Sequence, residues 1–405
     1  MPGLEKEIVV LSAVRTPFGK FCGALKDLSA TELGVITGRT AIVRAGVRPE
    51  EIDHVIFGNA QQTSVDAIYL ARHIGLKAGV PPSVPALTVN RICGSGFQSI
   101  VSGAQFLLLG EASFILAGGT ENMSQAPHVI RGARSGIPLG EGQLEDSLWS
   151  ALTDTYCNLN MAETAENLAR RYGITREEAD DFAYQSQMRT KSAQESGHLS
   201  LEIVPIVGFL DRDEHPRPNT TREALAALKP AFRKEGIVTA GNASGISDGA
   251  AAVVLSTSDK ARERGTQPLA RIVSWGIAGC EPAVMGIGPV PAMKMALDRA
   301  GLALKEIDLI EVNEAFACQY LAVEKELELD RTKVNVNGGA IAIGHPLGAT
   351  GTRLTTTLIY ELKRRNTRYG LGRTNSSSEQ GAERVHPQQS GLLFWDFSAN
   401  PASLR

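Results

Sequence analysis

A single cysteine, Cys93, stands between an apolar run and a stretch of small residues that is typical of the start of a helix. A thiol at a helix N-terminus lies near unpaired backbone N–H groups and the positive end of the helix dipole, and both favour the thiolate over the thiol. Glycines on both sides of Ser95 allow a substrate carbonyl to approach the backbone closely. Because free cysteines are most often buried structural residues, Cys93 is a candidate nucleophile only if the rest of the chain supplies its partners.

Two segments late in the chain could supply such partners. His345 lies between Gly344 and Pro346 in a glycine-rich turn before an expected helix, and histidine is the usual group that takes the proton of a thiol. Asn313 follows a predicted strand, where the loops after parallel strands build sites. Taken alone, a histidine in such a turn is more often structural. The glycines around it lack the spacing of a nucleotide-binding loop, so nucleotide binding is not favoured.

The elements that must position these residues alternate between strands and helices. Strands are predicted at residues 8–13, 52–58, 86–89 and 114–119, the last of them breaking at two glycines, and helical spacing covers residues 30–45. Such alternation is typical of a buried, parallel α/β sheet.

An internal repeat predicts that the chain is built from two related halves. Residues 44–56 and 299–311 share a helix–turn–strand pattern with identical spacing, and a single repeat of this length is typical of duplicated domains. We therefore expect three parts: an N-terminal half at residues 1–119 that is completed by about residues 245–268, an inserted loop domain at residues 120–244, and a C-terminal half at residues 269–405. The loop domain is expected to cover a site that is built on the two halves.

Composition excludes several classes of function. The 405 residues have a formal net charge of −3, which gives no basic surface of the kind that nucleic-acid binding requires. The five cysteines are scattered, odd in number and without a CxxC pair, so neither a disulfide framework nor a zinc site is expected. We expect a cytoplasmic protein with no leader, no membrane segment and no metal.

Six ordered motifs resemble the thiolase family, and the resemblance covers about residues 8–372. They are NRICGSG at 90–96, GGTENMS at 118–124, Met161 with TAEN at 164–167, GNASG at 241–245, NEAF at 313–316 and GHP at 344–346. The resemblance implies a thiolase-like α/β fold: two related halves with parallel-rich mixed sheets in an α-β-α-β-α layered arrangement, plus the loop domain. It also implies a CoA-dependent acyltransferase that cleaves 3-ketoacyl-CoA with free CoA, or condenses two acetyl-CoA in reverse, in fatty acid metabolism. Coenzyme A and acetyl-CoA are then substrates, no cofactor is tightly bound, and the expected assembly is a homodimer or homotetramer.

The resemblance also assigns roles to single residues. Cys93 is the nucleophile that becomes acylated, His345 is the base that activates it, and Asn313 holds a water that helps to bind the thioester oxygen. The backbone N–H of Cys93 is a second donor to an oxyanion. The expected CoA-binding residues are Ser244, Ala243, Met161, Phe316 and Lys229, of which Lys229 is equally well explained as a solvated lysine. Asn160 stands where short-chain members often carry a histidine, so a strict two-carbon specificity is not expected.

The chain departs from the family pattern after Gly372. The family carries a second cysteine there, which removes or returns the proton of the α-carbon, and Asn375 occupies its position. A carboxamide cannot take a carbon-bound proton at useful pH, and a general acid–base group contributes about 10²–10⁴-fold, so we expect slow carbon–carbon chemistry. In the atypical tail at 373–405, the apolar residues 391–397 are expected to come too late to form the missing last strand, which would leave a sheet neighbour unpaired. Cys318 is a weak candidate to replace the missing acid/base.

Two alternative functions stay open. A ketoacyl-synthase-like condensing enzyme is expected to use two catalytic histidines, or a histidine and an asparagine, and the combination of the NEAF and GHP motifs argues against it. A non-catalytic CoA-binding pseudoenzyme or oligomer partner is the other alternative, and it would bind CoA without forming an acyl-enzyme.

Overall fold

The computed structural model describes residues 6–374 and 388–396. Within these residues the main sheet is formed by β1 (Ile8–Arg15), β2 (Gly19–Lys20), β3 (His54–Gly58), β4 (Ala86–Val89), β5 (Phe114–Asn122), β10 (Ser247–Thr257), β11 (Ala270–Cys280), β12 (Leu309–Val312), β13 (Tyr369–Arg373) and β14 (Gln388–Asp396). The strand order is β12-β13-β14-β11-β1-β10-β5-β3-β4, and β2 pairs with β10. The pairs β12–β13, β3–β5 and β3–β4 are parallel, whereas the strands between them are antiparallel.

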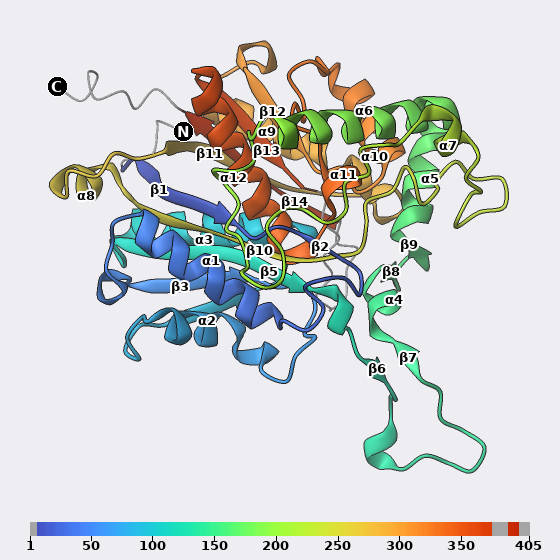
Figure 1. Ribbon diagram of the computed structural model, residues 1–405, viewed down its shortest axis with the longest axis horizontal. Coiled ribbons are helices and arrows are strands. Elements are labelled where there is room, and N and C mark those ends of the chain that lie inside the picture. The colour runs from blue at the N-terminus through green and yellow to red at the C-terminus, as the bar shows by residue number, and fades with distance from the viewer. Residues whose placement is uncertain (1–5, 375–387, 397–405) are drawn as a thin grey trace.

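The two halves of this sheet repeat one topology, as the sequence repeat predicts. In the first half, β3 pairs in parallel with β5, and β10 lies antiparallel between β5 and β1. In the second half, β12 pairs in parallel with β13, and β14 lies antiparallel between β13 and β11. The halves meet where β1 and β11 pair over three residues. In Figure 1 the first half is blue to cyan except for β10, which is yellow, and the second half runs from yellow-orange at β11 to red.

The expectation of a missing last strand is wrong. Residues 388–396 form β14, which pairs over its length with β11 and also with β13. Spacing along the chain makes residues 391–397 look too distant from β13 to complete the sheet. A strand is fixed by its backbone hydrogen bonds to the neighbouring strands, so the segment before it needs only to be long enough to reach them.

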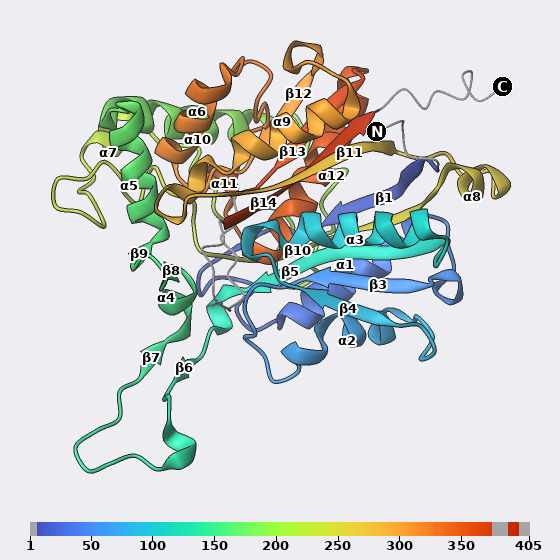
Figure 2. The same ribbon diagram turned by 180° about the vertical axis from the view of Figure 1, so that it is seen from behind.

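Helices form three layers around and between the strands. The principal ones are α1 (Ala30–Arg44), α2 (Leu70–Ala78), α3 (Ser95–Leu109), α9 (Pro289–Ala300), α10 (Ala317–Leu327) and α12 (Leu347–Arg365), with the short α8 (Ser258–Glu263) and α11 (Ala340–Ile343). Helices α3 and α12 pack in one hydrophobic cluster with strands of both halves, so they are the central layer. Helices α1 and α2 cover the outer face of the first half, and α9 and α10 cover that of the second (Figure 2).

The contact between the two central helices depends on glycine. A Cβ on Gly96 of α3 would lie 2.6 Å from the backbone N of Thr352, and one on Gly351 of α12 would lie 2.3 Å from the backbone N of Phe97. The helices therefore touch backbone to backbone near their N-terminal ends. Residues Ile92–Leu109 are long and apolar enough to cross a membrane by length and composition, but 61% of this segment is buried, as expected of a core helix.

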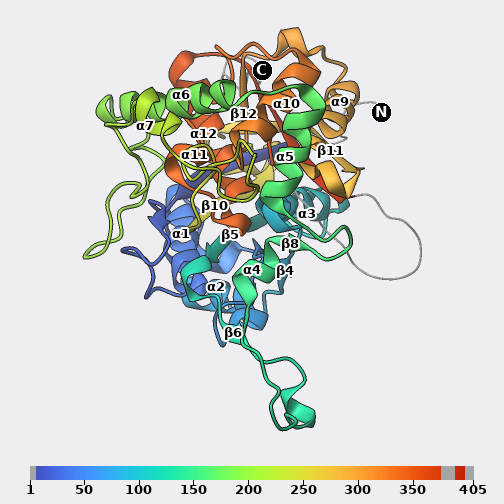
Figure 3. The same cartoon turned by 90° about the vertical axis from the view of Figure 1, so that its right-hand side faces the viewer.

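The segment between β5 and β10 leaves the sheet and returns to the neighbouring strand. It contains α4 (Ser147–Ala151), α5 (Met161–Tyr172), α6 (Arg176–Glu195) and α7 (Arg222–Ala226), with the short strands β6 (His128–Val129), β7 (Glu145–Asp146), β8 (Thr153–Asp154) and β9 (Leu159–Asn160). Thr175 and Glu178 form a capping box at the start of α6. The β6–β7 segment projects from the body as a long arm (Figure 3). Strand β5 itself continues past the two glycines where a break was expected, because both pair with β10.

Candidate active site

A cavity of about 790 Å³ opens where the two halves meet the segment between β5 and β10. Six of the residues predicted to form the site line it: Cys93, Met161, Ala243, Ser244, Phe316 and His345. Asn313 lies directly behind His345 and is fully buried. Lys229 is exposed and does not line the cavity, whereas two other basic residues, Lys20 and Arg217, do.

Cys93 is held in a tight turn at the start of α3. The turn is a single 3-10 helix, Ile92–Gly94, and Ile92 has a positive φ of 46°, which a β-branched residue adopts only under constraint. The side chain of Asn90 accepts from the N–H of Ile92, and Ser95 Oγ accepts from the N–H of Arg91. These bonds fix the backbone that presents the thiol to the cavity.

His345 approaches the thiol from the other half. It lies in the turn between α11 and α12, where Gly344 has a φ of 98° and Pro346 caps α12. Its backbone N–H is held by Gly245 O and Ser247 Oγ, at 3.1 and 3.0 Å. The ring then places Nε2 3.1 Å from Cys93 Sγ, which is a distance suited to proton transfer.

Thr350 determines which ring nitrogen of His345 carries the proton. Its hydroxyl donates to Pro346 O at 2.9 Å, so the same oxygen can accept from His345 Nδ1–H at 2.6 Å. Nε2 is then left with a free lone pair toward Cys93. Thr350 was not predicted from the sequence, although a hydroxyl residue five positions after the histidine, in the first turn of the following helix, is a usable signal.

Asn313 completes the buried group. It follows β12 directly, and its N–H donates to Arg373 O, which keeps the strand pairing to its end. Its Nδ2 lies 3.3 Å from His345 Nε2, and its Oδ1 has no hydrogen-bond partner among the described residues. The carboxamide is thus positioned to act on a group that binds beside Nε2.

Burial keeps the thiol and the imidazole neutral. Burial, with a smaller contribution from the charge of Glu121, raises the pKa of Cys93 to about 12. Burial, with a smaller contribution from the charge of Arg353, lowers the pKa of His345 to about 3. The expectation of a thiolate at rest is therefore wrong, because removal from water outweighs the helix N-terminus. The proton leaves sulfur only when His345 accepts it during attack.

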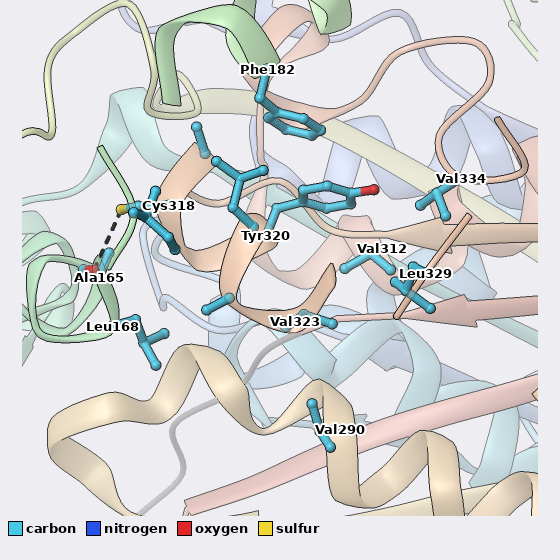
Figure 4. Packing of buried hydrophobic residues seen from close by; sticks show 14 of the residues in the cluster. Ala165, Leu168, Phe182, Val290, Val312, Cys318, Tyr320, Val323, Leu329 and Val334 are labelled. Carbon is cyan, nitrogen blue, oxygen red and sulfur yellow. Dashed lines mark hydrogen bonds between the residues drawn. The ribbon is translucent and has the colours of Figure 1, made fainter. Parts of the chain in front are cut away.

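Cys318 lies outside the site. It is buried in the hydrophobic cluster around α10, and its Sγ donates to Ala165 O (Figure 4). Burial raises its pKa to about 12, and it does not line the cavity. It is therefore not placed to act as the second acid/base that the family resemblance leads us to expect. Asn375, which occupies that position, lies outside the described residues.

The loop that carries Ala243 and Ser244 is tied to the loop that follows Asn313. The N–H of Ser244 donates to Ala315 O, and Ala243 forms a β-bridge with Phe316. Next to this loop the cavity is lined by His215, which the sequence reasoning missed, with Nε2 2.8 Å from Ser247 Oγ. The described residues contain no cluster of His, Cys, Asp and Glu that could hold a metal ion.

The chain is similar to known proteins over nearly its full length. The family model "Thiolase, N-terminal domain" matches residues 8–259, and "Thiolase, C-terminal domain" matches residues 266–386. The human protein "3-ketoacyl-CoA thiolase, mitochondrial" is 52% identical, covering 93% of this chain and 97% of that protein. "Acetyl-CoA acetyltransferase" of Cupriavidus necator is 48% identical, covering 90% and 95%. The crystal structure of human mitochondrial 3-ketoacyl-CoA thiolase in complex with CoA superposes with a TM-score of 0.94 at 50% identity, covering 98% of this chain and 99% of that one.

Proposed function

Because the chain belongs to the thiolase family, we propose that it is a CoA-dependent acyltransferase that works through an acyl-Cys93 intermediate. The reaction is thiolytic cleavage of a 3-ketoacyl-CoA or the reverse condensation of two acetyl-CoA. The observation that carries the proposal is the 3.1 Å contact between Cys93 Sγ and His345 Nε2 at the wall of a cavity large enough for a CoA thioester.

The acylation of Cys93 by acetyl-CoA uses only described residues. His345 Nε2 takes the thiol proton as Cys93 Sγ attacks the substrate carbonyl, and Asn313 with the Cys93 N–H acts on the oxygen that gains negative charge. In thiolysis the C2–C3 bond then breaks, and its electron pair goes to the α-carbon of the departing acetyl-CoA, which must gain a proton. Free CoA finally attacks the acyl-Cys93 thioester and releases acyl-CoA.

We infer that the protonation of the α-carbon is impaired, because Asn375 stands at the position of the family's second cysteine. Arg373, two positions before Asn375 and the last residue of β13, is also unusual. Arg373 is fully buried, and its guanidinium has no partner among the described residues. Burial holds the pKa of Arg373 well below its ordinary value.

The test is incubation with acetyl-CoA, followed by peptide mass spectrometry and an assay for acetoacetyl-CoA. We expect one acetyl group on Cys93 and little acetoacetyl-CoA, with peptide coverage of residues 365–405 to verify Asn375. Rapid condensation by a protein that carries Asn375 would refute the impaired second step. CoA binding without any acyl-enzyme would refute the enzyme and favour the non-catalytic alternative.

We propose that the protein assembles as a homodimer or homotetramer. Two surfaces support this assembly with a second copy of the chain. Strand β4 ends the strand order and borders an apolar groove of about 530 Å³ that is lined by Leu87 and by Phe106 of α3, so a symmetric copy could pair along the same edge. The β6–β7 arm exposes Ile137, Leu139 and Leu144. Replacing residues 130–143 by a short glycine-serine turn should reduce a tetramer to a dimer in light scattering, and an unchanged mass would contradict a role for the arm.

We propose a cytoplasmic location, which the five free cysteines support. Cell fractionation with mitochondrial and cytosolic markers tests it, and recovery with the mitochondrial marker would overturn it.

A further inference from the structure

Glu121 is the buried carboxylate of the GGTENMS segment, and none of the steps above uses it. It lies at the end of β5 with no exposed surface, and it forms no ion pair with the described residues. Its two oxygens accept from four donors: Asn59 Nδ2 and the N–H of Gln61 on Oε1, and the N–H groups of Ala60 and Gly348 on Oε2. Burying a carboxylate costs free energy that these four hydrogen bonds must offset, so its presence here suggests a role beyond filling space.

One of these donors belongs to the helix that carries the base. The N–H of Gly348, in the first turn of α12, reaches Glu121 at 2.8 Å. The same turn packs on the first half without room for a side chain, because a Cβ on Gly119 would lie 1.9 Å from Gly348 O. A carboxylate at a helix N-terminus is also favoured by the helix dipole. Glu121 therefore holds the first turn of α12 at Gly348, three residues after His345.

The other donors lead to the nucleophile. The loop after β3 is held by Glu121 through the N–H groups of Ala60 and Gln61. Ala60 O in turn accepts from Asn90 Nδ2 at 3.1 Å, and Asn90 Oδ1 accepts from the N–H of Ile92 at 2.9 Å. Ile92 is the strained residue directly before Cys93. One carboxylate thus links the turn of the thiol in one half to the turn of the base in the other.

We propose that Glu121 is a positioning residue that sets the contact between Cys93 and His345. This proposal rests on the proposed function, whose chemistry it serves. A thiol with a high pKa gives a more nucleophilic sulfur once His345 removes its proton. It also resists oxidation, because the thiolate is the species that oxidants attack.

The charge of Glu121 can be tested through the pKa of the Cys93 thiol, which a purely structural role of Glu121 would leave unchanged. Among the described residues, His345, from the turn before α12, contacts the thiol, and the carboxylate of Glu121, from β5, acts on it through its charge. Arg353 of α12 acts on the imidazole instead. Burial raises the pKa of Glu121 to about 7, so the carboxylate is ionised at the alkaline pH where a buried thiol titrates.

The experiment compares three variants of the full chain. Glu121→Gln keeps the shape and removes the charge. Glu121→Asp keeps the charge and shortens the reach. Glu166→Gln is the matched control, because Glu166 is another buried carboxylate that accepts from backbone N–H groups, those of Ile237 and Val238, within the loop domain. Alkylation of Cys93 by iodoacetamide is followed by peptide mass spectrometry from about pH 8 to 12.5, and kcat and KM are measured for acyl transfer from acetyl-CoA.

We expect Glu121→Gln to lower the alkylation midpoint by about one pH unit, because a like charge near the thiol is removed. Both Glu121 variants should lose about 10- to 100-fold in kcat with a smaller change in KM, because the reacting groups are misplaced. The midpoint should stay unchanged in Glu121→Asp and in Glu166→Gln.

An unchanged midpoint in Glu121→Gln, or an equal shift in Glu166→Gln, would overturn the proposal. If Glu121→Gln does not fold, the Glu121→Asp variant decides, and a wild-type kcat there overturns it as well. Absence of acyl-enzyme in the wild type would instead refute the proposed function, and the alkylation midpoints would still test the role of Glu121.

Discussion

Replacing Thr350 by valine tests the assignment of the proton on His345. Valine has nearly the shape of threonine and is β-branched like it, so packing should change little. The change removes the oxygen that accepts from Nδ1–H at 2.6 Å. Pro346 O is not left unpaired, because the N–H groups of Ala349 and Thr350 still donate to it.

The magnitude follows from the burial of the ring. A buried N–H without an acceptor costs about 1–3 kcal/mol, and the alternative tautomer would put a hydrogen on the nitrogen that must accept one from Cys93. Either outcome raises the barrier to acylation, so we expect the acylation rate to fall about 5- to 150-fold at unchanged CoA affinity. Rapid quenching with acetyl-CoA, followed by mass spectrometry of the Cys93 peptide, measures this rate.

The same helix offers a matched control. Thr355 is equally buried, and its hydroxyl has no hydrogen-bond partner among the described residues. Thr355→Val should therefore acylate within about twofold of the wild type, because no bond is lost. Wild-type acylation by Thr350→Val would refute the tautomer, and an equal loss in both variants would assign the effect to helix packing.

Three further predictions concern stability and binding. Arg373→Met should raise the free energy of unfolding by about 1–3 kcal/mol in urea titrations, because it removes a buried cation without a partner, and a destabilised variant would contradict that reading. Because the pKa of His345 falls from 6.5 to about 3 on folding, its contribution to stability is complete above pH 6.5 and is lost as pH falls through that window. His345→Asn should thus flatten the acid side of the stability profile, and an identical profile would contradict the neutral imidazole. Arg217→Ala should weaken binding of CoA about tenfold in calorimetry, since Arg217 lines the cavity, whereas Lys229→Ala should not; the reverse order would restore Lys229 as the phosphate contact.

The sequence motifs predicted which residues meet at the site better than they predicted the protonation state of those residues. Cys93, His345 and Asn313 could be identified because each stands in a short backbone context that its chemistry needs. The protonation of Cys93 was misjudged, since a local pattern shows the helix start but not how much of the molecule excludes water from it.

Contacts between residues far apart in the sequence could not be predicted either, because local patterns do not show which distant segments meet. Glu121 meets Gly348 across the two halves, and no local spacing signals that contact. Lys229 could not be separated from Arg217, because both are basic residues of one polar segment and only the folded loop shows which of them faces the cavity. The apolar run of β14 was visible, but its neighbours β11 and β13 were not.

The route of the chain between β5 and β10 has a consequence for how such proteins can diverge. Asn122 at the end of β5 pairs with Asp248 at the start of β10, so the whole excursion begins and ends at adjacent positions of the sheet. Insertions or rearrangements within it cost little loop entropy and leave strand pairing untouched. Met161, His215 and Ser244 belong to this excursion, whereas Cys93 and His345 lie in the turns that precede the two central helices. Evolution can therefore exchange the part of the cavity wall that this segment supplies while the reacting pair is inherited unchanged.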